Sequence, residues 1–360
     1  MNERIKQHAD NSPMLKQSLG THSKIRWDIT GKELANSLIS QFGSNEVNRI
    51  HLADAAYLYA NDQMDFIADQ VAPVFPVNSL AGKYRKFDER MNFDRPDVKR
   101  GKDSPPAKIN QGSEFENYDL SGRALSVYMS NVDRDDAVNQ YGSTAKWRKV
   151  LTEQLTHLLL IDLEIEVADL LQTTGNYAAG FTATATPLWS DASANFQENV
   201  MTGEDALYAD RDVIVMGYDV YRQCQKSPQI KGASTVSSGS GKRKDNLPFV
   251  NLESISNFFD SEIVVGKARY NSSPESSTMT LSRIWANHAV IMHRGSGREF
   301  ETPFARIFKL QSQTFPNVGG FTVKSVMDSS SIAGGELLMV GYWAQPKVFA
   351  QKAGYKLKCL

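Results

Sequence analysis

The sequence is poor in the residues and runs that most often reveal chemistry or compartment. It holds only two cysteines, Cys224 and Cys359, and no C-x-x-C pair. A disulfide framework and a cysteine-type zinc site are therefore unsupported, and a reducing cytoplasm is the expected environment. No run approaches the ~20 apolar residues that cross a bilayer, and residues 1–20 lack the apolar core of a secretory signal. We expect a chain that folds in water.

An excess of charge of either sign is also absent. The chain has 40 Lys and Arg against 41 Asp and Glu, a formal net charge of −1 over 360 residues. This balance argues against a nucleic-acid binder whose whole surface is basic, so any basic function must be local. The length predicts about two globular units with a sizeable core.

Catalytic motifs are missing as well. Gly241-Lys242 lacks the glycine and the Ser/Thr that a phosphate loop requires, and Gly295-Ser-Gly297 has Phe300 where a dinucleotide fingerprint needs glycine. The six histidines are scattered and none is in an H-E-x-x-H motif. We therefore predict no catalytic, cofactor-binding or metal-binding residue and a protein that is not an enzyme. A cytoplasmic hydrolase with an unrecognised site is the alternative from a different class.

A long amphipathic helix over residues 144–172 is the strongest pattern that is present. Leucines and a valine recur at i, i+4 spacing, namely Leu151, Leu155, Leu159, Leu163 and Val167. Ser143 is the expected N-cap, and Gly175 lies just past the expected end. Asp162, Glu166 and Asp169 share one face of this helix. We expect them to form a solvated surface opposite the leucine stripe.

Other elements alternate around this helix. Helices are expected at 30–41, 48–72, 218–226 and 252–259, and strands at 213–216, 263–265, 289–292, 321–327 and 337–343. Residues 228–246, rich in Ser and Gly, are predicted to be a loop, and Lys352, Lys356 and Lys358 a basic tail. The fold class is therefore α+β without a repeat.

A charged stretch over residues 78–122 allows two interpretations. Residues 83–108 alone hold nine Lys or Arg and five Asp or Glu. The stretch is either a disordered linker or an extended two-stranded arm, because residues 84–87 and 115–120 are strand-like. The sequence leaves both open.

The order of these elements resembles the major capsid proteins of tailed phages, which have the Hong Kong 97-type fold. The residues that carry the resemblance are the helix 147–171, the strand–helix unit 212–221, the strand 284–292 and the ending 334–343. The resemblance covers about residues 30–360. It implies five regions, which are an N-arm at 1–50, a helical segment at 51–77, an extension loop at 78–122, a peripheral domain at 123–211 with 336–360, and an axial domain at 212–335.

The resemblance also implies a function. The chain would self-assemble into the pentamers and hexamers of an icosahedral shell that encloses double-stranded DNA, located in the virion and, during assembly, in the host cytoplasm. An encapsulin-type cargo shell is the alternative with the same fold. Expected partners are other copies of the chain, a separate scaffolding protein, a portal, a decoration protein, and DNA bound without sequence specificity, but no membrane and no cofactor.

Two basic groups are the expected contact residues. Intersubunit contacts are predicted for the extension loop, at Arg85, Lys86, Arg90, Arg95 and Arg100. A DNA-facing surface is predicted for the N-arm, at Arg4, Lys6, Lys16, Lys24 and Arg26. Pairing of the second group with acidic residues of a neighbour is the equal alternative.

Overall fold

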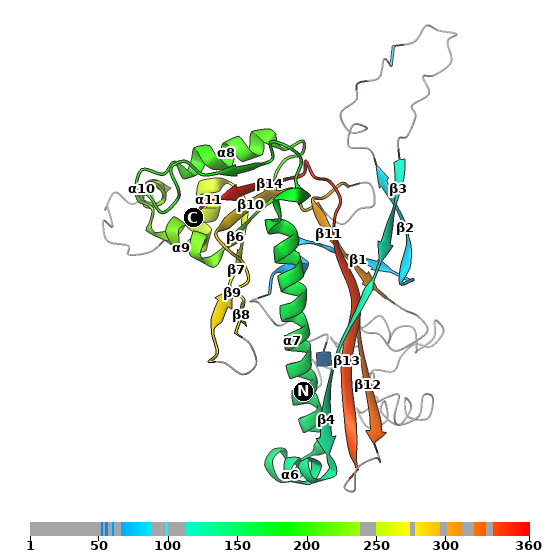
Figure 1. Ribbon diagram of the computed structural model, residues 1–360. Coiled ribbons are helices and arrows are strands. Elements are labelled where there is room, and N and C mark those ends of the chain that lie inside the picture. Colours follow the sequence, from blue (N-terminus) through cyan, green and yellow to red (C-terminus); the bar gives the residue numbers. More distant parts are fainter. Residues whose placement is uncertain are drawn as a thin grey trace, which may run out of the picture.

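The structure is a computed structural model that describes residues 66–87, 113–237, 250–273, 278–295, 301–311, 320–328 and 334–360, with single positions at 52, 55, 56, 60, 95, 98 and 99. The predicted N-arm, the helix at 30–41 and the end of the loop at 228–246 lie outside these residues. Figure 1 shows an elongated molecule built along one long helix, with a β-sheet beside the helix and a second, helix-covered sheet near one end.

The long helix, α7, spans Thr144–Gln172 as predicted. The Ser143 side chain accepts a hydrogen bond from the Lys146 amide and so caps the first turn. The predicted leucine stripe is buried at all five positions from Leu151 to Val167. The extended Thr173 is the C-cap, and Gly175 lies just past this end, as expected, in the short helix η2 (Thr174–Asn176). Lys356 closes this end by donating to the Gln172 carbonyl at 2.6 Å.

The first sheet packs along α7. Its strand order is β1 (Val74–Val77), β11 (Ala305–Leu310), β13 (Gly335–Val348) and β12 (Phe321–Asp328), with β4 (Ser121–Ser130) paired to the other side of β13. β13 continues through Pro346, which lies where β13 pairs with β11 alone, a place where a strand tolerates the missing amide. The first core cluster fills the space between this sheet and α7.

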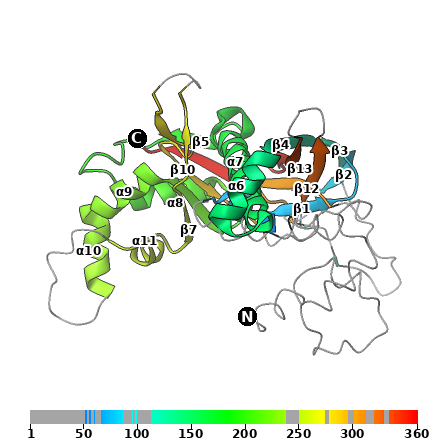
Figure 2. The ribbon, with the colours of Figure 1, turned by 90° about the horizontal axis from the view of Figure 1, so that it is seen from below.

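The second sheet has the order β5 (Thr182–Thr184), β14 (Gly354–Lys358), β10 (His288–Met292), β6 (Val213–Gly217) and β7 (Glu262–Gly266). A second core cluster joins it to α8 (Phe196–Ala206), α9 (Tyr218–Lys226) and α11 (Leu252–Phe259). Figure 2 shows these helices and the first sheet on opposite sides of α7. The predicted strands and helices of this region are confirmed. The hairpin of β8 (Arg269–Asn271) and β9 (Leu281–Arg283) extends from it.

Two local expectations are wrong. The loop expected from residue 228 begins as helix α10 (Pro228–Ser237), since proline fits the first turn of a helix and Ile230 is fully buried. The expected basic tail is β14, in which Lys356 is only 8% exposed. The backbone of β14 pairs with β10 in the second sheet. A polar sequence pattern does not reveal this pairing.

Strand pairing also bears on how the chain is divided. Residues 305–309 and 321–328 pair with 335–348 in the first sheet, while 354–358 pair with the strands of the second. The predicted ranges of the peripheral and axial domains remain predictions, and the pairing places segments of both ranges in each sheet. The helix expected over residues 48–72 is interrupted, because Phe66 and Ile67 are not helical and α5 spans only Ala68–Val71. Its end before Pro73 is as expected from proline's missing amide.

Candidate assembly site

The charged stretch forms a two-stranded arm. β2 (Ala81–Phe87) pairs antiparallel with β3 (Ser113–Asp119), so the second of the two interpretations is confirmed for these residues. Alternate side chains of the ribbon point to opposite faces. The inner face carries Tyr84 and Tyr118, which are buried against Phe308 at ring-centroid distances of 5.0 and 5.2 Å. The root of the arm is therefore fixed to the first sheet by aromatic packing.

Charged groups add to this anchor. The Glu116 carboxylate accepts from the Tyr84 hydroxyl and from Lys86 Nζ at 2.9 Å, and lies 3.0 Å from Lys347 Nζ of β13. Lys347 also donates to the Asn117 carbonyl at 2.8 Å. Burial by itself would raise the pKa of Glu116, but the three donors outweigh it and lower the pKa to about 2. The carboxylate thus stays charged at neutral pH and connects the arm to β13.

The outer face of the arm has a different character. Phe115 is 65% exposed and lies directly opposite Arg85, and Lys83 lies two residues before Arg85 on the same face. An exposed phenylalanine flanked by basic side chains is typical of a surface that contacts another macromolecule. Sequence reasoning missed Phe115 as a contact residue, although the strand alternation that separates it from Glu116 and Tyr118 was available.

The ten predicted contact residues differ in where they lie relative to the described part of the chain. Arg85 and Arg95 are exposed. Lys86 binds Glu116 of its own chain. Arg90 and Arg100 lie outside the described residues. So do all five predicted DNA-facing residues, which are Arg4, Lys6, Lys16, Lys24 and Arg26. Their intersubunit and DNA-facing roles remain predictions.

The acidic face of α7 is only partly a solvated surface. Arg123 of β4 donates to Asp162 and to Glu166, so two of the three carboxylates bind the first sheet. Asp162 and Asp169 are exposed, as expected, although Asp162 also binds Arg123. The expectation is wrong for Glu166, which is half-buried because tertiary packing brings β4 against α7.

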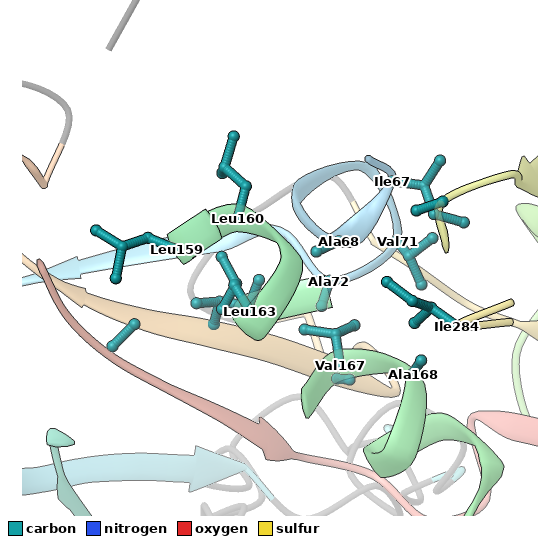
Figure 3. Packing of buried hydrophobic residues seen from close by; sticks show 14 of the residues in the cluster. Ile67, Ala68, Val71, Ala72, Leu159, Leu160, Leu163, Val167, Ala168 and Ile284 are labelled. Carbon is teal, nitrogen blue, oxygen red and sulfur yellow. The ribbon is translucent and has the colours of Figure 1, made fainter. Parts of the chain in front are cut away.

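A buried carboxyl group on the same helix was not predicted. Glu164 is 0% exposed and accepts from the amides of Ile67 and Ala68 and from the Trp285 indole. Figure 3 shows Ile67, Ala68 and Ile284 beside the part of α7 that carries Leu163 and Val167. Trp285 follows Ile284 in the sequence. Burial raises the pKa of Glu164 to about 7, although the hydrogen bonds favour the charged form. One side chain therefore joins the segment before β1, the long helix and the loop before β10.

The described residues form neither a metal site nor a membrane-spanning helix. Within the part of the chain that the structure describes, no three His, Cys, Asp or Glu side chains gather as a metal site would need. No described helix combines the length and apolar character needed to span a bilayer. Cys224 and Cys359 are buried free thiols.

Comparison with known proteins connects this geometry to capsids. No family model matches the chain. The major capsid protein of Pseudomonas phage JBD67 is 27% identical over 307 residues, covering 84% of this chain and 94% of that protein. A phage-related protein from Bordetella bronchiseptica RB50 has a similar structure, with a TM-score of 0.63 and 17% identity over 85% of this chain and 95% of its own. A capsid chain of cyanophage P-SCSP1u matches with a TM-score of 0.50 and 10% identity, over 81% of this chain and 88% of that one.

The long helix, the two-stranded arm and the two sheets define a Hong Kong 97-type capsid fold, as the resemblance in the sequence implied. Over most of its length the chain is thus similar to a phage major capsid protein, in sequence as well as in fold.

Proposed function

We propose that the chain is a major capsid protein of a tailed phage that forms the pentamers and hexamers of an icosahedral virion shell. We further propose that this shell encloses double-stranded DNA and that the arm joins neighbouring subunits. The observation that carries the proposal is the contrast between the two faces of the arm. Tyr84 and Glu116 fix the inner face to the subunit's own sheet, whereas the outer face exposes Phe115. A rigid root with an exposed aromatic face suits a contact with another copy.

The charge balance supports the same function. Many copies of a strongly charged subunit would repel one another in a closed shell, and a net charge of −1 keeps that repulsion small. Head-to-tail contacts between identical subunits close into rings when the rotation between them allows it. In this proposal the basic residues of the first 26 positions bind DNA phosphates, and a scaffolding protein, a portal and a decoration protein are the further partners.

The test removes the segment between the two strands of the arm. Replacing residues 88–112 by Asn-Gly provides a two-residue turn suited to an antiparallel pair. The variant keeps β2, β3 and their contacts with Phe308, so we expect wild-type thermal unfolding but no shells. Electron microscopy and size-exclusion chromatography measure assembly, and the unfolding temperature is the control for folding. Normal shells from this variant would show that the arm does not hold subunits together.

The content of the particles tests whether the shell encloses double-stranded DNA. Particles purified from cells that produce the phage should contain double-stranded DNA that resists added nuclease. Shells filled with a protein cargo in place of DNA would favour the encapsulin-type alternative.

A further inference from the structure

A hollow of about 250 Å³ lies among the end of β4, the helix α6 (Asn131–Tyr141) and the first turns of α7. Met129, Trp147 and Leu151 supply apolar surface, while Asp133 and Asp136 bring two carboxylates to its lining. Small-molecule sites usually start at about 300 Å³. The hollow therefore suits a single large side chain of a protein partner better than a cofactor. We call it the α6 groove.

The outer face of the arm complements this groove in shape and charge. Phe115 offers an aromatic ring that is 65% exposed, which matches the apolar surface beside Trp147. Arg85 lies directly across the ribbon from Phe115 and offers a positive charge to Asp133 and Asp136. An aromatic anchor with a basic neighbour, set against an apolar hollow with an acidic rim, is the arrangement found at the centre of many protein interfaces.

A subunit's own arm cannot reach its own groove. β3 continues into β4 with only Leu120 between them, and both strands are extended. Thirteen residues separate Phe115 from Tyr128, a residue of the groove lining, and at ~3.3 Å per residue this is roughly 43 Å. Figure 1 shows the arm and α6 at opposite ends of this ribbon. An arm that occupies the groove must come from another copy, in a head-to-tail contact.

We propose that the outer face of the arm docks in the α6 groove of a neighbouring copy, with Phe115 against the apolar surface and Arg85 against Asp136. This inference rests on the proposed assembly and identifies the surface that receives the arm. Because the contact is head-to-tail, each subunit uses its arm on one neighbour and its groove on another.

The first test removes the aromatic anchor. Phe115→Ala should leave unfolding unchanged, because the ring is exposed in the subunit, and should lower the yield of shells by about tenfold or more. Met279→Ala is the matched control, since Met279 is 64% exposed on the loop before β9. Shells at wild-type yield from Phe115→Ala would overturn the proposal.

The second test exchanges the charges. Arg85→Glu and Asp136→Arg should each impair assembly, and the double variant should recover it, because the pair is restored with opposite sign. Asp135→Arg is the control, being an exposed α6 carboxylate outside the groove lining. If the double variant assembles no better than the single variants, or if Asp136→Arg alone has no effect, the groove does not receive the arm.

The wild-type protein separates this inference from the proposed function. Absence of shells from the wild-type chain would contradict the proposed assembly itself. If the wild-type chain forms shells and the variants Phe115→Ala and Asp136→Arg form them equally well, only the docking of the arm in the groove is contradicted. If Asp136→Arg impairs assembly but Phe115→Ala does not, the groove binds a different occupant, and the docking proposal is overturned.

Discussion

Glu164 shows how strongly one residue can depend on distant parts of the chain. It lies on the buried stripe of α7, four residues after the buried Leu160 and three before Val167. Its three donors come from residues about 100 positions away in both directions. Asp69 lies nearby and favours the protonated form, as burial does. The balance of burial, donors and a neighbouring charge places its titration near neutral pH.

This titration predicts a pH-dependent stability. The pKa of Glu164 rises from 4.5 to about 7 on folding, so between these values the folded chain keeps a proton that the unfolded chain has lost. The resulting stabilisation is fully present below pH 4.5 and is lost as the pH rises through about 7, and the full shift corresponds to about 3 kcal/mol. Urea unfolding between pH 5 and pH 8 should therefore show falling stability.

Two variants test the assignment to Glu164. Glu164→Gln cannot ionise, so this component of the pH dependence should vanish. Glu153→Gln, a change on the same helix at a carboxylate near Lys149, should preserve it. A wild-type pH slope in Glu164→Gln would assign the effect to other groups.

The arm and the long helix α7 differ in how far each can be predicted from local sequence. α7 follows from local spacing and its cap, because both signals lie within one stretch of sequence. The arm pairs residues that are 26 to 38 positions apart, from Phe87 with Ser113 to Ala81 with Asp119. Its root contacts β11 and β13. The alternation of apolar and polar residues indicates its two strands but not the sheet on which they rest.

The contact between Lys347 and the arm can be removed separately. Lys347→Met deletes the bonds to Glu116 and Asn117, which are partly exposed, so the free energy of unfolding should fall by about 1 kcal/mol or less. Amide hydrogen exchange of residues 113–119 should nevertheless become faster, because the root of the arm is less restrained. Lys358→Met, at an exposed position on β14, should leave this exchange unchanged. Unaltered exchange in Lys347→Met would show that aromatic packing alone fixes the arm.

At the scale of the whole molecule, the two surfaces proposed for assembly lie at opposite ends of one continuous ribbon. This separation favours contacts between copies over contacts within one. The near-zero net charge permits dense packing of copies, while local groups of opposite sign remain available for specific contacts. Basic residues in the first 26 positions are available for a different partner.

Neutralising that basic group distinguishes its two interpretations. Replacing Arg4, Lys6, Lys16, Lys24 and Arg26 by Gln should leave shell formation intact if these residues bind packaged DNA. In particles from phage-producing cells, the DNA should then be lost at lower salt or temperature than in the wild type, because fewer phosphates are neutralised. Failure to form empty shells would instead indicate that the five residues pair with acidic groups of a neighbouring subunit.

The sequence by itself determined the α+β class, the long helix α7 with its Ser143 cap and most strands of the second sheet, whereas the structure decided that the charged stretch forms a two-stranded arm. Each feature that the sequence determined depends on spacing or capping within a short stretch, where side-chain periodicity reports directly on the backbone. Only the tertiary structure decided that Glu164 is buried beneath distant donors and that Arg123 binds Asp162 and Glu166. It also decided that Lys356 lies inside a sheet. Those outcomes depend on which elements come together, and the free energy of such long-range contacts is not encoded in any local pattern.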